Sequence, residues 1–349
     1  GINFFTPPSG ISIEKMISTN CEAKNASGEQ GDKEAKYKIS TSCSYSPSLL
    51  AYYHVSRILG GIGNIPPAVL RTIDLDRHLK IAEIGMRITS RGDNDLIYAN
   101  WKTLYSRLKL GAKYERADQL FSDQYDQTYG ALQWNPKNEN LYKEFFNGGV
   151  DRAASFREKN PIYKALINPQ MPVGKDFSQK NVQMMVQLRD ASEMILIDTL
   201  LGQQDRFGNI HYILKYLYPE EVNGLTKIKS TSDKNEIPAS AADKAVLVKE
   251  MILKDNDCGV AKDNLIKKAG LIDRVAHISP STYKRFMHFE SDLDNEETKR
   301  FFTKGFVFTE RDYRTMRENA REIATRWKKA CSEGRLKLDL GLEKHFFPR

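Results

Sequence analysis

The chain has 349 residues, of which 40% are apolar and 28% charged, and its formal net charge is +8. This length exceeds one minimal domain and suits two lobes that share a cleft, and no apolar run approaches the roughly 18 to 20 residues of a membrane span. Basic residues are mixed with acidic ones and no zinc-finger, arginine-rich or stacking-aromatic motif accompanies them, so we expect no nucleic-acid partner.

The first third of the sequence is predicted to be dominated by strands. Residues 20–36 are polar and contain Gly and Ser, which predicts an exposed loop between two N-terminal strands. A helix is expected from Pro47 to Leu59, because Pro47 suits a first helical turn and apolar residues then recur at helical spacing. The segment 128–136 closes an aromatic-rich stretch and predicts a strand that runs into a turn.

The remainder is predicted to be mostly helical around one strand pair. Residues 181–201 give the clearest helical pattern, with an apolar stripe and Gly202 where a C-terminal cap belongs. Strands that flank a turn are expected near 205–215 and 245–255, and residues 262–333 continue as helices. The predicted fold class is therefore α+β, with a strand-rich first lobe and a helical second lobe.

Four cysteines stand at positions 21, 43, 258 and 331. No two of them are separated by two residues, which excludes a CxxC zinc or redox motif. The even count is compatible with two disulfides, and buried free thiols in a cytosolic protein are the alternative.

The segment from Leu200 to Ile210 carries the strongest chemical signal. A buried helix there leads into a short polar loop that contains Asp205, and Asn209 follows four residues later. Phosphoryl transfer needs a carboxylate to orient and deprotonate the acceptor hydroxyl, and a carboxamide oxygen assists at the metal. We therefore expect Asp205 to be the catalytic base and Asn209 to assist in metal binding. The alternative is an ordinary Asp-Arg pair with a Gly-Asn turn at a helix-to-strand junction.

A second acid-rich loop follows about fifty residues later, where an apolar strand ends in the sequence KDNDCG at residues 254–259. Carboxylate oxygens at such a strand end suit Mg²⁺ or Mn²⁺, which bridge the phosphates of ATP. Asp255 is the expected metal ligand. An ordinary turn is the alternative, because Asp-Asn-Asp-x-Gly also favours turn geometry. The order of helix, DRxxN loop, strand and DND loop favours ATP-dependent phosphoryl transfer.

With these two loops the chain resembles the secretory-pathway atypical kinases, a family that includes the Golgi casein kinase, the proteoglycan xylosylkinase and four-jointed. In that family a Met/Leu-Gly-Asn-x-Asp-Arg-His catalytic loop precedes a Leu-Asp-Asn-Gly metal loop. Cys331 also stands where a late family cysteine does. Further stretches similar to family motifs are the strand at 36–38, the helix and its exit at 51–69, the inter-lobe hinge at 130–136 and the helix start at 278–286.

The resemblance implies a two-lobed, protein-kinase-like fold with an N-lobe over residues 1–132, a C-lobe over 133–349 and an ATP cleft between them. It assigns Lys38 to the ATP phosphates and places Gln133 and Trp134 in the nucleotide-binding hinge. The implied activity is transfer of the γ-phosphate of ATP, with Mg²⁺ or Mn²⁺, to a Ser/Thr hydroxyl of a protein or to a hydroxyl of a glycan.

The resemblance and the even cysteine count together imply a secreted, Golgi-lumenal or periplasmic location. They also imply two disulfides. One is Cys21–Cys43, around the polar loop, and the other is Cys258–Cys331, between the metal loop and the last helix.

The sequence departs from the family at two points. Leu49 stands where the family places the helix glutamate that pairs with the ATP lysine, and no acid occurs from 48 to 59. This departure keeps open a catalytically impaired, nucleotide-binding pseudokinase that regulates a partner. The residues after Asp-Arg, at 207–210, are closer to phosphatidylinositol kinases and keep a lipid acceptor open as a third hypothesis.

Overall fold

The computed structural model divides into two compact units, which are considered separately. The first unit comprises Gly1–Leu50, Pro66–Lys137 and Lys304–Phe308, and the second comprises Ala51–Ile65, Asn138–Thr303 and Thr309–Arg349. The residues that the structure describes are 1–19, 23–41, 44–90, 95–146, 151–171, 173–174, 176–260 and 264–343.

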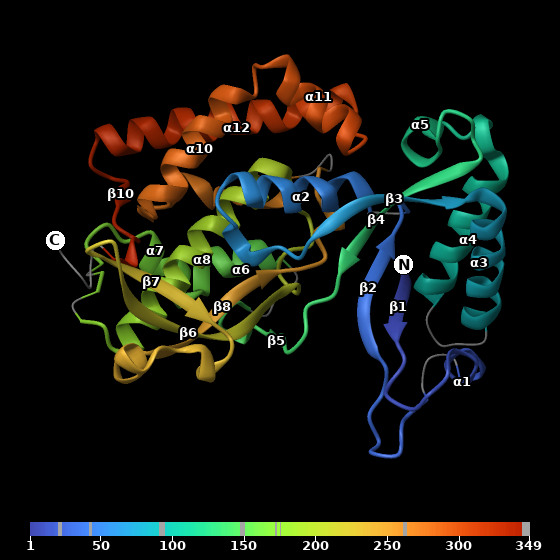
Figure 1. The fold of residues 1–349 in the computed structure, drawn as a ribbon. Coiled ribbons are helices and arrows are strands. Elements are labelled where there is room, and N and C mark those ends of the chain that lie inside the picture. Colours follow the sequence, from blue (N-terminus) through green and yellow to red (C-terminus); the bar gives the residue numbers. More distant parts are fainter. Residues whose placement is uncertain are drawn as a thin grey trace. The chain divides into compact units, whose positions relative to one another are not determined.

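The first unit is built on a four-stranded antiparallel sheet in the order β1-β2-β4-β3 (Figure 1). Its strands are β1 (Ile2–Thr6), β2 (Asp32–Lys38), β3 (Ala68–Asp74) and β4 (Gln127–Trp134). Its helices are α1 (Ile13–Ser18), α3 (Leu75–Thr89), α4 (Asp95–Leu110) and α5 (Ala117–Leu120).

Helices α3 and α4 pack against each other, and their apolar side chains share a core with one face of this sheet. Tyr37 of β2 lies in that core, and its hydroxyl donates to the carbonyl of Thr128 at 3.2 Å. Gly130 of β4 is required beside it, because a Cβ there would stand 2.3 Å from the Tyr37 ring. The side chain of Asp74 begins α3 by accepting from the Arg77 amide.

The first third of the chain contains more helix than the sequence analysis predicts. Helices α3 and α4 have 15 and 16 residues, and neither was expected. The strand predicted at 128–136 is confirmed as β4, and the helix predicted at 47–59 is confirmed as α2 (Ser46–Ile58). A short helical turn, Ile62–Asn64, follows α2.

The second unit combines a small sheet with most of the helices. Its main sheet places β6 beside β5, β7 and β8, all antiparallel. Its strands are β5 (Asn140–Leu141), β6 (Ile210–Val222), β7 (Leu225–Thr231), β8 (Val246–Leu253), β9 (His277–Ile278) and β10 (Lys337–Leu338). Its helices are α6 (Arg152–Lys159), α7 (Pro161–Leu166), α8 (Gln179–Leu201), α9 (Leu265–Lys268), α10 (Pro280–Asp292), α11 (Glu296–Gly305) and α12 (Glu310–Ser332).

Helix α8 is the central element of this unit and confirms the helix predicted at 181–201. It packs against β8, α7 and α12 (Figure 1). Its second half is buried on nearly every side and not along one stripe, so that the acids Asp190, Glu193 and Asp198 are buried with the apolar residues. Gly202 ends it in the left-handed conformation with φ of 67°, as the capping pattern predicts.

The predicted fold class is confirmed: the chain is an α+β protein with an antiparallel-strand first unit and a largely helical second unit. Within the described ranges, none of the helices combines the length and the apolar composition that a bilayer crossing requires.

The predicted Cys258–Cys331 disulfide is wrong, because both residues are thiols in the structure. Val260, two residues after Cys258, shares a small cavity with Asn319 in the middle of α12. Cys331 lies twelve residues (331 − 319) farther along that helix, about 18 Å at 1.5 Å per residue. A disulfide needs Cα atoms within roughly 7 Å. Cys21 and Cys43 lie outside the described residues, so their predicted bridge stays a prediction.

Candidate active site

Asp205 lies in a polar loop between the end of α8 and the start of β6. The side-chain oxygen of Gln203 accepts hydrogen bonds from the amides of Gln204, at 2.9 Å, and Asp205, at 3.1 Å, which fixes the bend of the loop. Asn209 then donates to the Asp205 carbonyl at 2.8 Å and to its carboxylate at 3.3 Å. The Asp205 side chain is exposed, so an acceptor molecule can approach its carboxylate from solvent.

The loop that contains Asp255 lies directly beside the Asp205 loop. Strands β6 and β8 pair with Ile210 opposite Leu253, so the residues before β6 adjoin the residues after β8. Backbone hydrogen bonds continue this pairing, from the Lys254 amide to the Asn209 carbonyl at 3.4 Å. A second bond runs from the Gln204 amide to the carbonyl of residue 258 at 3.2 Å. The structure thus brings Asp255 beside Asp205 and Asn209, although about fifty residues separate the two loops in the sequence.

Asp255 has a backbone conformation that is unusual for a residue with a side chain. Its φ and ψ are both 48°, in the left-handed region, where Asp and Asn are the best tolerated residues after Gly. Its side chain is half-buried, whereas the following Asn256 is fully buried. At this sharp turn two neighbouring side chains differ in burial: Asn256 lies in the core, and Asp255 stays near the surface.

A buried ion pair between Arg206 and Asp198 holds the two loops together. Both side chains are fully buried, and the guanidinium binds the carboxylate through two hydrogen bonds, of 2.7 and 2.8 Å. Arg206 also donates to the Asn256 side-chain oxygen at 2.6 Å and to the Lys254 carbonyl at 3.0 Å. One guanidinium therefore connects the Asp205 loop, the Asp255 loop and helix α8.

Tyr52 of α2 completes this arrangement. Its hydroxyl donates to Asp198 at 2.9 Å, and its ring lies against Arg206, with the guanidinium carbon 5.7 Å from the ring centre. Burial, together with the negative charge of Asp198, raises the pKa of the Tyr52 hydroxyl, so that it stays protonated and donates. Burial opposes the charged form of Arg206, but the Asp198 carboxylate outweighs this effect and leaves the pKa of Arg206 raised.

Sequence reasoning missed Asp198 and Tyr52. Both occur in segments with an apolar helical pattern, and in such segments an isolated polar residue gives no sign of its partner. For Asp198 one signal was present: it is the one acid in the apolar last two turns of the helix, where it needs a buried cation, and Arg206 is eight residues away.

The predicted nucleotide-binding residues lie in the first unit, and the structure places them on two faces of its sheet. Pairing of β2 with β4 sets Lys38 opposite Ala131 and Lys36 opposite Gln133, so Lys38 and Gln133 share one face. Trp134 belongs to the other face, is 46% exposed, and its amide donates to the Pro67 carbonyl at 2.9 Å.

Of this set, Gln133 has the clearest capacity to bind a ligand. Its side chain is buried on the face that carries Lys38, and its amide nitrogen Nε2 finds no hydrogen-bond partner in the described part of the chain. A buried donor without a partner is costly, which favours a ligand acceptor at this position. Leu49 is fully buried, as a packing residue and not a partner for a cation.

The residues of the second unit fit a divalent cation of the Mg²⁺ type. Within the described ranges, no cluster of three or more His, Cys, Asp or Glu side chains could hold a metal by itself. Mg²⁺ does not need one, because it is bound through one or two carboxylates while phosphates and waters complete its octahedron. Asp255 supplies a carboxylate, and Asn209 donates its amide hydrogens to Asp205, which leaves its oxygen for a cation.

Comparison with known proteins gives a fold likeness only. No family model matches the chain, and no curated protein matches it. Among solved structures it is similar to the crystal structure of the Golgi casein kinase, with a TM-score of 0.43 and 13% identity, over 83% of this chain and 63% of that one. A structure of the Golgi casein kinase with Mn/ADP bound gives a TM-score of 0.41 and 13% identity, over 83% and 62%. The chain thus spans less than two thirds of either. The protein in both is a member of the family that the sequence resembles.

Replacement of Tyr52 by Phe tests the contact between α2 and the ion pair. The variant keeps the ring but removes one of the two donors, Tyr52 and Arg206, to the buried Oδ1 of Asp198, so we expect unfolding to become easier by about 1–3 kcal/mol. Tyr53→Phe, on the half-buried neighbouring residue, should change stability by less than about 0.5 kcal/mol. Urea denaturation of the parent and both variants measures this. Equal effects of the two substitutions would contradict the assigned hydrogen bond.

Proposed function

We propose that the chain is an atypical kinase that uses ATP and Mg²⁺ or Mn²⁺ to phosphorylate a hydroxyl group of a protein Ser/Thr residue or of a sugar. One observation carries this proposal: a buried Arg206–Asp198 pair holds an exposed Asp205 beside Asp255 on an adjoining loop. A carboxylate for the acceptor and a carboxylate for a cation, at a fixed separation, are the protein groups that phosphoryl transfer needs.

The proposed roles follow the position of each residue. Asp205 would accept the proton of the acceptor hydroxyl, because its carboxylate is exposed and its orientation is set by Asn209. Asp255 and the Asn209 oxygen would hold the metal ion. Lys38 would bind ATP phosphates, and Gln133 would bind the base through its buried amide. In this scheme residues 1–132 would be the N-lobe and residues 133–349 the C-lobe.

When bound, MgATP would supply the transferable phosphoryl group and the positive charge that stabilises it. The residues of this chain would do the rest. The Asp205 carboxylate would orient the acceptor oxygen and take its proton, and the Arg206 clamp would keep the two carboxylates from moving apart. Trp134 is a weaker candidate than Gln133, because it lies on the opposite sheet face and its amide is already bonded within the sheet.

A catalytically impaired pseudokinase is the second candidate. The observation in its favour is the fully buried Leu49 on α2, a helix that contains no acid. In ordinary kinases a helix glutamate pairs with the ATP lysine. Identifying the acceptor as a protein, a glycan or a lipid would separate one class of kinase from another. Phosphate transfer to any of these acceptors would separate a kinase from a pseudokinase. We further propose that the protein functions in the secretory pathway or an equivalent oxidising compartment.

Asp205→Asn should separate catalysis from binding. The substitution keeps size and hydrogen bonding but cannot accept a proton, so ATP affinity should be unchanged while phosphate transfer falls by about 10²–10⁴-fold. Transfer of labelled phosphate to protein, glycan and lipid acceptors, alongside ATP affinity, measures both. Asp243→Asn is the control, because it makes the same charge change at an exposed turn and should leave both unchanged. A parent that binds ATP yet transfers nothing to any acceptor would support the pseudokinase instead.

Asp255→Asn should abolish the metal-dependent part of nucleotide binding. Asn tolerates the left-handed conformation of residue 255 but lacks the charge, so the fold should persist. At a ligand concentration of about 100 Kd, MnATP should stabilise the parent by about 2.7 kcal/mol. The variant should lose the part of this gain that EDTA removes in the parent. A variant stabilised as strongly as the parent would show that Asp255 is not the ligand.

Thiol titration of the denatured, unreduced protein tests the proposed compartment. Cys258 and Cys331 are thiols, and Cys21–Cys43 is the bridge that an oxidising compartment would form, so we expect two reactive thiols per chain. Four thiols in protein exported to such a compartment would contradict the bridge. The exported protein must be used, because the cytosol keeps thiols reduced whatever the native pairing is.

A further inference from the structure

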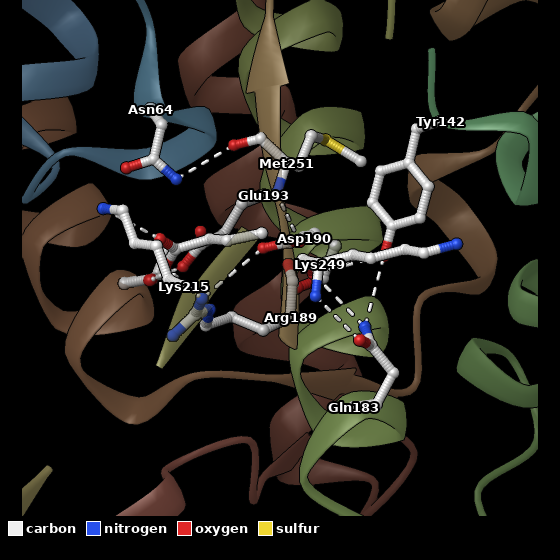
Figure 2. A network of polar contacts seen from close by, with 12 residues as sticks. Asn64, Tyr142, Gln183, Arg189, Asp190, Glu193, Lys215, Lys249 and Met251 are labelled. Atoms are coloured by element: carbon white, nitrogen blue, oxygen red, sulfur yellow. Dashed lines mark hydrogen bonds and ion pairs between the residues drawn. The ribbon is translucent and has the colours of Figure 1, made fainter. Parts of the chain in front are cut away.

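A second polar cavity lies within the second unit, formed by residues that the proposed transfer site does not use. It has a volume of about 480 Å³, within the range of small-molecule sites. The residues that define it, here called the α8 cavity, are Gly60–Asn64, Arg189, Asp190, Glu193, Glu250 and Thr282. Figure 2 shows several of them, with Arg189, Asp190 and Glu193 all on α8.

Two of the three acids in this cavity are only partly compensated by the protein. Glu250 is paired with two cations, although its buried Oε2 has no hydrogen-bond donor in the described part of the chain, and Glu193 has one hydrogen bond, while burial leaves its pKa raised. Glu250 accepts from Arg189 at 3.0 Å and lies 3.1 Å from the Lys215 ammonium, and although burial alone would raise its pKa, these two cations lower it. Glu193 accepts from the Thr282 hydroxyl at 2.7 Å, at the first turn of α10, where the helix dipole favours a negative charge.

Asp190 is the most deeply buried of the three acids. It is only 2% exposed, and one of its oxygens accepts from the Met251 amide at 2.9 Å. For the other, Oδ1, the described residues supply no hydrogen bond, and Arg189 stands 3.5 Å away (Figure 2). Burial raises the pKa of Asp190 to about 7, and the charges of Glu250 and Glu193 add to this effect, whereas Arg189 opposes it.

Three buried carboxyls of the cavity are in contact with two cations, and a third cation, Arg285, acts on Glu193 from the open side by lowering its pKa against the effect of burial. The buried carboxyls are Asp190, Glu193 and Glu250, and the cations that contact them are Arg189 and Lys215. Two further charged residues, Arg285 and Glu343, line the open side with opposite signs. Apolar residues complete the wall, namely Leu217 of β6, Ile228 of β7 and Leu340.

We propose that the α8 cavity binds a small organic cation, a protonated amine with a hydrocarbon body whose ammonium group pairs with Asp190. The ammonium would supply the donors that Oδ1 lacks, and the hydrocarbon part would cover the leucine and isoleucine side chains. Because the whole chain carries a net charge of +8, general electrostatic attraction opposes cation binding, and any cation affinity requires a specific site.

Three four-carbon molecules test the choice of ligand without any variant. Putrescine carries two ammonium groups, butane-1,4-diol has the same length without charge, and succinate carries the opposite charge. At about pH 8, where Asp190 is ionised, calorimetry with the parent and EDTA present should detect binding of putrescine alone. Binding of the diol or succinate as tight as that of putrescine, or no binding of putrescine, would overturn the proposal.

Asp190→Asn tests the residue. The Asn side-chain oxygen can still accept from the Met251 amide, so the fold should persist, while putrescine affinity should fall by about tenfold or more. Asp243→Asn, exposed and outside the cavity, should bind like the parent. Because a cation displaces the Asp190 proton, parent affinity should fall between about pH 8 and pH 6, whereas residual binding by the variant should vary less, because Glu193, whose pKa burial also raises, is then the remaining titrating acid. Equal affinity of the parent and Asp190→Asn would assign any putrescine site elsewhere.

Discussion

The buried ion pair between Asp198 and Arg206 is the interaction on which the candidate active site depends. Two charges without any exposure to water are costly, and this cost is met only when every hydrogen-bonding group finds a partner. Here the guanidinium makes two bonds to Asp198 and one each to Asn256 and the Lys254 carbonyl. Because these partners come from separate segments, satisfying one arginine fixes the relative positions of the two loops that carry the candidate chemistry.

The same pair extends the constraint to helix α2. Tyr52 donates to Asp198, so this helix is tied to the base of the Asp205 loop through a hydroxyl and not through a carboxylate on its own surface. The absence of an acid on α2 therefore does not leave that end of the helix without a polar anchor. The two candidate functions differ in what they require of Lys38. An active kinase needs Lys38 to bind the ATP phosphates without a helix glutamate, whereas a catalytically impaired pseudokinase does not.

The sequence predicted those candidate residues that stand in a recognisable local pattern. Asp205 and Asp255 each follow a strongly apolar element and stand in a short polar loop, and this local pattern by itself marks both as candidates. Both strands were expected, near 205–215 and 245–255, but β7 lies between them in the sequence, so the antiparallel pairing of β6 with β8, which joins the two loops, has no local signal. Helix α8 and its Gly202 cap were predictable, because apolar spacing and a glycine stop are local signals.

The parts that escaped prediction depend on contacts between distant segments. Tyr52 and Asp198 are 146 positions apart, and nothing local marks them as partners. Helices α3 and α4 bury only a few side chains, against the sheet face that carries Tyr37, so most of their residues are polar or exposed and the apolar signal is short. The disulfide expected at Cys258 failed because a cysteine position inferred from a resemblance gives no spatial distance, and α12 extends well beyond the Asp255 loop before it reaches Cys331.

The central claim is that the two loops held by Arg206 form one metal-dependent transfer site. The most direct measurement is a crystal structure with Mn²⁺ and a non-hydrolysable ATP analogue, with the metal located by its anomalous scattering. The account predicts a manganese peak coordinated by the Asp255 carboxylate and by phosphate oxygens, with the Arg206–Asp198 pair unchanged. A peak bound to neither Asp255 nor Asn209, in crystals where the nucleotide is visible, would contradict it.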